Sequence, residues 1–402
     1  MKILISNPSK QYSHQTVKAL MQKHTVIFAT SFWHKPQNVI GKILRLFTSL
    51  RKELDKKTDS SIPVEYVYTH WSGILYKFFG RFLIKDVEQW SFMEDSIHDR
   101  WVSRKIRKWQ PQLVIGYEKS CLKTFTVARS LGITTLLDVA QVHTGFIEML
   151  RNVYPFFKTI SGAENLFEKI HLRKKKEYNL ANHIMVLSSF AQQTFIDNGI
   201  DADKISKVHL GFNPNQFQIK NFLINSEDVP LRLIFVGIVT LRKGIALLVE
   251  VMQELLPFPI ELLIVGPRGD ASYLVNTKSQ YRNIQYLEYL SHSDLVKALQ
   301  ESDVLVMPSY LDSWAAVVVE AMACGLPVIV SDNTGAKDIV NDSNGIIIST
   351  GNKEQLKQAV LFYFNNRIEV NLMGQAAAEK AKQYSWINYY QEIDSVIQQL
   401  KK

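Results

Sequence analysis

Two adjacent cations, Arg242 and Lys243, stand shortly after an apolar run that ends in Gly237. The run from 232 to 237 is predicted to be a buried strand, and Gly244 then opens the next helix. Positive side chains beside the free N–H groups of a helix start suit a diphosphate group. An isolated Arg-Lys pair is also common on ordinary solvated surfaces, so both interpretations stay open at this point.

Two carboxylates, Asp312 and Glu320, form a second candidate for chemistry. Asp312 follows the predicted strand 303–307, at the carboxyl end of a parallel strand, where open α/β sheets bind their ligands. A helix expected from about Ala315 places Glu320 roughly two turns further on. Its apolar neighbours predict that Glu320 is partly buried and needs a partner. The pair could accept hydrogen bonds from sugar and ribose hydroxyls; the alternative is a charge at a helix start plus a solvated Glu.

The elements that position these residues follow from an alternation of apolar, β-branched runs with amphipathic stretches along all 402 residues. Such alternation predicts parallel sheets flanked by helices on both faces. A polar stretch over 213–230 separates two series. We expect an α/β fold with two Rossmann-like domains, 1–215 and 230–384, and a final helix over 385–402 that crosses back to the first domain. Strands are predicted at 2–6, 25–29, 64–68, 112–116, 134–139, 183–187, 232–237, 260–265, 284–287, 303–307, 327–330 and 346–348.

These pieces, in this order, resemble the retaining family-4 glycosyltransferases of the GT-B fold (glycosyl transferases group 1). The family has a cation pair after a Val-Gly strand end, then two Glu separated by seven residues; here Asp312 replaces the first Glu. The family's Gly-Phe-Gly reads Ser313-Trp314-Ala315. The resemblance covers about 185–390. Further similar pieces are Val265-Gly266-Pro267, Thr334-Gly335-Ala336-Lys337-Asp338, Asn344-Gly345 and Ser385-Trp386.

The resemblance implies that the two domains face each other across a cleft and that the second binds a nucleoside diphosphate sugar. Arg242 and Lys243 would neutralise the diphosphate leaving group, Asp312 would hold sugar hydroxyls, and Glu320 would hold the ribose. The resemblance also implies further donor-binding residues: Gly237, Gly266, Trp314, backbone N–H groups of Ala315, Ala316 and Val317, and Tyr289 and Leu290 against the nucleobase.

The first domain offers one catalytic candidate, His143, after the predicted strand 134–139. It would match the family's cleft His near the transferred sugar. A lone His in a loop is also commonly structural, so both roles are kept.

The charge is unevenly divided. The net charge is +9, with 32 Lys and Arg against 20 Asp and Glu in residues 1–230 (+12), and 15 against 18 in 231–402 (−3). The excess predicts an anionic partner for the first part. Residues 39–54 could supply a basic amphipathic helix for an anionic membrane, or simply a core-facing stripe. Its apolar face is Ile40, Ile43, Leu44, Phe47, Leu50 and Leu54, and its cations are Lys42, Arg45, Arg51 and Lys52.

Composition and further motifs exclude other classes. With 46% hydrophobic and 21% charged residues the chain is globular. No apolar run reaches about 18 residues, so no membrane-spanning helix is predicted. The first residues have a strand pattern, which leaves no room for a signal peptide. We therefore expect a cytoplasmic protein that can also bind the cytoplasmic face of the membrane. Cys121 and Cys324 are too few for a disulfide framework or zinc site. Asp201-Ala202-Asp203 and the run Arg173–Lys176 are interpreted as solvated segments, so neither a metal, a cofactor nor nucleic acid is expected.

The predicted function is therefore a retaining glycosyltransferase of the hexosyltransferase type, which moves a sugar from a nucleoside diphosphate donor to a glycan or lipid-linked glycan acceptor in cell-surface polysaccharide or glycolipid synthesis. Two alternatives remain. One is another GT-B enzyme, such as an epimerase or phosphorylase. The other is a degenerate scaffold that binds a partner glycosyltransferase, an idea that Asp312 and Ala315 keep open because they depart from the family pattern.

Overall fold

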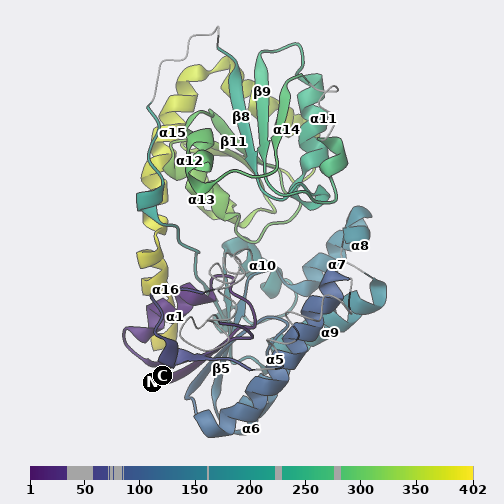
Figure 1. The fold of residues 1–402 in the computed structure, drawn as a ribbon. Coiled ribbons are helices and arrows are strands. Elements are labelled where there is room, and N and C mark those ends of the chain that lie inside the picture. Colours follow the sequence, from purple (N-terminus) through teal and green to yellow (C-terminus); the bar gives the residue numbers. More distant parts are fainter. Residues whose placement is uncertain are drawn as a thin grey trace, which may run out of the picture. The chain divides into compact units, whose positions relative to one another are not determined.

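The computed structural model describes residues 1–33, 58–70, 72, 76, 84, 86–160, 163–221, 229–275 and 282–401. These residues form two compact units, each built on one parallel β-sheet with flanking helices (Figure 1). The first unit comprises Met1–Val186, Ile196–Val208 and Tyr390–Lys402, and the second comprises Leu187–Phe195 and His209–Tyr389.

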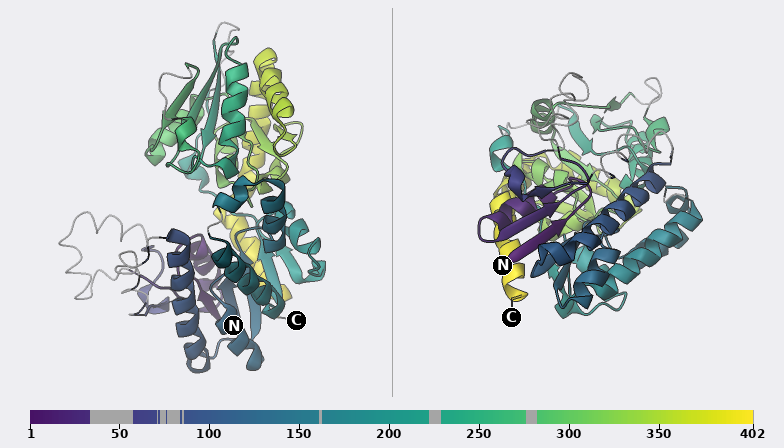
Figure 2. Two further views of the ribbon diagram at one scale, coloured as in Figure 1. Left: turned by 90° about the vertical axis from the view of Figure 1, so that its right-hand side faces the viewer. Right: turned by 60° about the horizontal axis from the view of Figure 1, so that its bottom comes forward.

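The first unit contains a seven-stranded parallel sheet in the order β3-β2-β1-β4-β5-β6-β7. Its strands are β1 (Lys2–Ser6), β2 (Thr25–Ala29), β3 (Val67–Tyr68), β4 (Leu113–Tyr117), β5 (Thr134–Val139), β6 (His183–Val186) and β7 (Ile205–Lys207). Its helices include α1 (Ser13–Met21), α5 (Val87–Trp109), α6 (Leu122–Ser130), α7 (Thr144–Val153), α8 (Phe156–Ile160) and α9 (Glu164–Leu180). The last helix, α16 (Trp386–Gln399), belongs to this unit from Tyr390 onward. Both chain ends therefore lie in the first unit, near one another (Figure 2).

The second unit contains a six-stranded parallel sheet in the order β10-β9-β8-β11-β12-β13. The strands are β8 (Leu231–Val236), β9 (Ile260–Val265), β10 (Ile284–Leu287), β11 (Val304–Met307), β12 (Val328–Ser331) and β13 (Gly345–Ile348). The helices include α10 (Ser189–Ile196, in this unit up to Phe195), α11 (Ile245–Glu254), α12 (His292–Gln300), α13 (Ala316–Ala323), α14 (Lys353–Asn365) and α15 (Arg367–Ala381). In this unit α11 packs with α14 and α13 packs with α15.

The predicted strands agree with those observed within one residue at each end, except for 64–68, because parallel strands buried on both faces have nearly continuous apolar sequences. In 64–68 the first three residues form the 3-10 turn η1 (Val64–Tyr66), and only Val67–Tyr68 form strand β3. Every residue of β4 and β11 is buried, for example. The short strand β7 was not predicted. It has only three residues and follows the turn η2 (Ala202–Lys204), in which Asp201 caps the Asp203 amide. Asp201 and Asp203 therefore lie in an exposed turn, as expected for a solvated loop.

The division into units differs from the predicted domains at Leu187–Phe195 and at 209–215, which lie inside the predicted first domain but belong to the second unit. Leu187–Phe195 is tied to the second unit by hydrogen bonds, among them one that the Ser188 hydroxyl donates to the Ser313 carbonyl at 2.8 Å. The predicted amphipathic segment 39–54 lies outside the described residues.

The expectation of a solvated face for Arg173–Lys176 is wrong for its first half. Arg173 and Lys174 are buried on α9, whereas Lys175 and Lys176 are exposed. Arg173 pairs with Asp99 on α5, and Lys174 pairs with Glu118 after β4. These cations therefore hold the first unit together.

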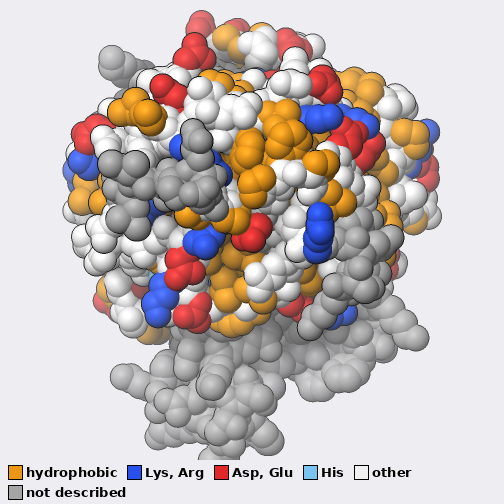
Figure 3. Space-filling model, turned by 90° about the horizontal axis from the view of Figure 1, so that it is seen from above, with side chains coloured by type: hydrophobic (Ala, Val, Ile, Leu, Met, Phe, Trp, Pro, Cys, Tyr) orange, Lys and Arg blue, Asp and Glu red, His pale blue; other side chains and the backbone are white. Residues whose placement is uncertain are grey.

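Two surface properties bear on partners. No helix in the described part of the chain has an apolar stretch long enough to cross a membrane. On the face shown in Figure 3, acidic and basic side chains are interspersed with hydrophobic ones, and neither sign forms a continuous field.

Candidate functional site

The chain reverses its winding direction between β8 and β11 of the second unit. From β8 it continues to β9 on one side, and the later strand β11 lies against the other side of β8. At such a switch point the loops after the two strands separate and leave a crevice at their carboxyl ends, where open α/β sheets bind ligands. The loop after β8 holds Arg242 and Lys243, and the loop after β11 holds Asp312.

Gly244 brings these two loops into contact. Its φ of 78° lies in the left-handed region, and a Cβ there would be 2.1 Å from the Pro308 carbonyl oxygen. Only glycine combines this conformation with so close an approach. Arg242 and Lys243 lie before it in the 3-10 turn η4 (Leu241–Lys243), so the cations precede α11 and do not form its first turn.

The two cations contact the loop after β11 differently. Lys243 Nζ forms an ion pair with Asp312 Oδ2. Arg242 Nη1 donates to the Leu311 carbonyl at 2.6 Å, and the Arg242 carbonyl accepts from the Tyr310 amide at 2.8 Å. The structure thus brings the predicted cation pair and the first predicted carboxylate together.

Asp312 also accepts hydrogen bonds from two backbone amides just before α13. Its Oδ1 accepts hydrogen bonds from the amides of Trp314 and Ala315 at 3.2 and 2.9 Å. Burial opposes ionisation of this carboxyl, but Lys243, Arg242 and the Trp314 amide together hold its pKa below the usual value. The Ala315 amide, predicted to bind phosphate, is therefore already bonded to Asp312. Ala316 and Val317 form the first turn of α13.

Ala315 precedes α13 in the left-handed conformation, with φ 59° and ψ 68°. A residue with a Cβ rarely adopts this conformation, whereas glycine does so readily. The family's glycine at this position therefore has a conformational reason, and Ala315 retains the backbone geometry without the glycine.

Glu320 is partly buried on α13, as predicted, and burial raises the pKa of its carboxyl. The expected partner is not among the described residues, where no hydrogen bond or ion pair of this side chain is found. The carboxylate is thus available to a ligand.

Three buried polar atoms in these loops have no hydrogen-bond partner within the described residues: Thr240 Oγ1, Ser309 Oγ and Trp314 Nε1. Thr240 precedes η4, Ser309 follows β11, and the Trp314 ring lies 5.2 Å from the ring of His209. Buried polar groups normally have a partner. The two hydroxyls were not predicted from the sequence, because only their position after β8 and β11 distinguishes them from other loop Ser and Thr residues.

The sequence that contains the loop after β8 matches a known protein family. Residues 217–380 match the family model described as glycosyl transferases group 1. The second unit is a group 1 glycosyltransferase domain. Membership of this domain in group 1 is therefore confirmed, and with it the glycosyltransferase class, whereas the retaining family-4 assignment stays a prediction.

Curated proteins similar to this chain belong to the same class. The chain is 27% identical over 234 residues to an uncharacterized glycosyltransferase of Methanocaldococcus jannaschii, covering 54% of this chain and 60% of that protein. It is 22% identical to the amylovoran biosynthesis glycosyltransferase AmsK of Erwinia amylovora, covering 65% and 70%. It is 26% identical to the N,N'-diacetylbacillosaminyl-diphospho-undecaprenol alpha-1,3-N-acetylgalactosaminyltransferase of Campylobacter jejuni, covering 46% and 48%. The chain thus spans about half to two thirds of the length of these relatives.

Solved structures confirm the fold. The structure of the Anabaena protein HepE in complex with UDP superposes with a TM-score of 0.65, at 13% identity, over 99% of each chain. Sucrose-phosphate synthase from Thermosynechococcus elongatus superposes with a TM-score of 0.64, at 17% identity, over 99% of this chain and 98% of that one. The chain thus has the predicted GT-B fold with two Rossmann-like sheets.

The remaining donor-site predictions concern the strands beside β8. Gly266 ends β9 and contacts Gly237, whose carbonyl oxygen would lie 2.0 Å from a Cβ at Gly266. Tyr289 and Leu290 follow the edge strand β10. Tyr289 is 79% exposed and Leu290 is half-buried, so an aromatic surface is present there for a base to stack on.

His143 lies in the first unit after β5 and is 4% exposed. It caps α7, with Nδ1 accepting from the Gly145 amide at 3.0 Å, and its ring lies 4.9 Å from that of Tyr178. Burial, followed by the nearby Lys175, lowers its pKa to about 4. The structure therefore gives His143 a structural task, and its catalytic role stays a prediction.

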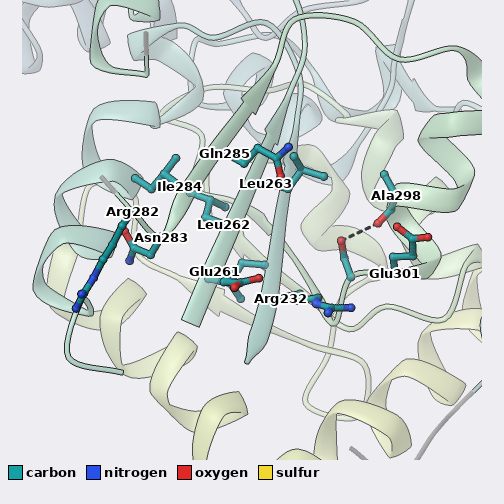
Figure 4. Close-up of a pocket in the computed structure, with 12 residues that line it drawn as sticks. Arg232, Glu261, Leu262, Leu263, Arg282, Asn283, Ile284, Gln285, Ala298 and Glu301 are labelled. Carbon is teal, nitrogen blue, oxygen red and sulfur yellow. Dashed lines mark hydrogen bonds between the residues drawn. The ribbon is translucent and has the colours of Figure 1, made fainter. Parts of the chain in front are cut away.

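Among the described residues, no group of three or more His, Cys, Asp or Glu side chains could hold a metal ion. A cavity of about 410 Å³ lies near the amino ends of β8, β9 and β10, lined among others by Arg232, Glu261 and Arg282 (Figure 4). It contains none of the predicted site residues.

Proposed function

We propose that this protein is a retaining glycosyltransferase that moves a sugar from a nucleoside diphosphate donor to a glycan or lipid-linked glycan acceptor. The observation that carries the proposal is the contact of Lys243 and Arg242 with the Asp312 loop at the switch point of a group 1 glycosyltransferase domain. Lys243 is the cation for the developing charge of the leaving diphosphate, and preorganised charges of this kind lower transfer barriers substantially.

The other residues complete a donor site. Glu320 accepts hydrogen bonds from the ribose hydroxyls, since its carboxylate has no partner among the described residues. Thr240 and Ser309 donate to the diphosphate or sugar, which satisfies their buried hydroxyls. Tyr289 stacks on the base. The cations perform the neutralising task without a metal or cofactor.

The acceptor class rests on the named relatives. One acts in amylovoran biosynthesis, and the name of another contains a diphospho-undecaprenol acceptor. We propose the same class here, in cell-surface polysaccharide or glycolipid synthesis. The +12 charge of residues 1–230 and the sequence pattern of 39–54 support a cytoplasmic protein that binds an anionic membrane face reversibly. Sedimentation with anionic but not neutral liposomes at low salt tests this location; a protein that stays in the supernatant with both contradicts it.

The donor is tested by thermal shift with UDP-, GDP- and ADP-sugars, because a ligand that binds only the folded state raises its apparent stability. Lys243→Ala should make the shift clearly smaller. Transfer, or slow donor hydrolysis, should be about 100-fold or more slower in the variant than in wild type. Full activity of Lys243→Ala would contradict the assignment of Lys243 to the donor site.

The degenerate scaffold remains a second candidate because Ala315 stands in the left-handed position before α13. Donor binding without hydrolysis or transfer to any tested acceptor would favour the scaffold. An epimerised sugar or sugar phosphate among the products would favour another GT-B enzyme.

A further inference from the structure

The cation of the donor crevice already has an anionic partner. Lys243 and Asp312 form an ion pair, and only 14% and 13% of their side-chain surfaces are exposed. The second oxygen of the Asp312 carboxylate accepts from the amides of Trp314 and Ala315. A single carboxylate thus occupies a lysine ammonium and two amides before a helix, which are the two kinds of donor that a phosphate group uses.

We propose that Asp312 is a built-in counter-ion that competes with the diphosphate for Lys243. This inference rests on the proposed function, since it requires a nucleoside diphosphate at Lys243. When the ligand binds, the Lys243 ammonium moves its ionic contact from Asp312 Oδ2 to a phosphate oxygen. The Asp312 carboxylate keeps its two amide contacts, and no covalent bond changes.

The counter-ion has a use in both states of the site. Without a ligand it neutralises Lys243, because a largely buried ammonium without a partner is strongly unfavourable. With a ligand it repels negative charge. The released nucleoside diphosphate has one more ionisable oxygen than the donor sugar, so Asp312 weakens binding of the product more than binding of the substrate. Asp312 is thereby a positioning residue that favours product release.

The test is calorimetric titration of UDP, GDP and ADP into wild type, Asp312→Asn, Lys243→Gln and the double variant. Asparagine retains an acceptor oxygen for the two amides, so the cap before α13 persists. Asp312→Asn should bind the preferred diphosphate about three- to thirtyfold more tightly, in line with coupling between contacting charges. In the Lys243→Gln background the same change should have little effect.

Two control variants test whether the gain in affinity comes from removing the negative charge of Asp312. Asp270→Asn removes a carboxylate that accepts from the Leu241 amide at 2.9 Å but pairs with no cation among the described residues. It should bind within about twofold of wild type. Asp312→Glu keeps the negative charge and should bind the diphosphate no more tightly than wild type. If Asp312→Asn folds poorly, tighter binding by Asp312→Glu would still contradict the counter-ion proposal.

The outcomes separate the two proposals. If wild type binds a nucleoside diphosphate but Asp312→Asn binds it equally or more weakly, the counter-ion proposal is wrong and the proposed function stands. If Asp312→Asn increases the affinity equally in the Lys243→Gln background, Asp312 does not act by competing for Lys243, and the proposal is wrong. If none of the proteins binds any of the three diphosphates, both proposals fail.

Discussion

The guanidinium of Arg173 on α9 donates to the Asp99 carboxylate on α5 at 2.9 Å, with 9% and 1% of the two side-chain surfaces exposed. Asp99 also accepts from the amides of Lys123 and Thr124, which begin α6. Glu177, one turn after Arg173, accepts from the Cys121 amide at 3.1 Å. This ionic network joins three helices of the first unit.

Arg173→Ala should lower the free energy of unfolding by about 3–5 kcal/mol, because it leaves a buried carboxylate without its cation. Lys176→Ala, three residues further on the exposed face, should change it by less than about 0.5 kcal/mol. Urea denaturation of both variants checks this. Equal stability of the two variants would mean that the network contributes little.

Asp138 predicts a specific pH dependence. Burial raises the pKa of this carboxyl to about 7, although Tyr12 and Tyr117 donate to it. A carboxyl whose pKa is higher folded than unfolded stabilises the fold below the unfolded pKa, and this contribution is lost as the pH rises toward 7. Relative to Asp138→Asn, wild type should lose about 1–3 kcal/mol of stability between pH 4 and pH 8. Parallel urea midpoints for both proteins across this range would contradict the prediction.

Ala315→Gly should leave the protein equally stable or more stable by up to about 1 kcal/mol, because release from the left-handed conformation offsets the larger entropy of the unfolded chain. The matched control is Ala316→Gly, which has no such release in the first turn of α13 and should be destabilised by up to about 1 kcal/mol. Thermal unfolding measures both. A loss of stability in Ala315→Gly as large as the control's would show that position 315 is not strained.

Glu320→Gln should separate ligand binding from stability. Burial raises the pKa of Glu320, so replacing the carboxylate with an amide should maintain or raise the melting temperature. The donor KM should rise about tenfold, because ribose hydroxyls lose a charged acceptor. Steady-state kinetics and thermal unfolding test the two parts. An unchanged KM would mean that Glu320 does not bind the donor. A lower melting temperature would mean that the Glu320 carboxylate stabilises the fold.

Local sequence was sufficient to predict most strands of the fold. Apolar runs such as 260–265 and 284–287 coincide with β9 and β10, because burial on both faces leaves a strong apolar signal. The three-residue strand β7 has too few residues for such a signal. The site could be predicted where residues follow a strand end, as Lys243 and Asp312 do.

Contacts between distant segments could not be predicted. Nothing near Arg173 indicates that Asp99, 74 residues earlier, neutralises it. The position of Asp312 after β11 does not show that its carboxylate already holds Lys243. The burial of His143 likewise depends on Tyr178 of α9, which packs against its ring.

The three-part construction of the first unit has a consequence for the order in which the protein is made. Tyr390 donates to Gln15 of α1 at 2.6 Å, and Asp394 pairs with Lys23 at 2.7 Å. N-terminal domains commonly fold while the ribosome is still adding residues. Here the partners of Gln15 and Lys23 are translated after the entire second unit, so the first unit to be synthesised is the last to complete its contacts.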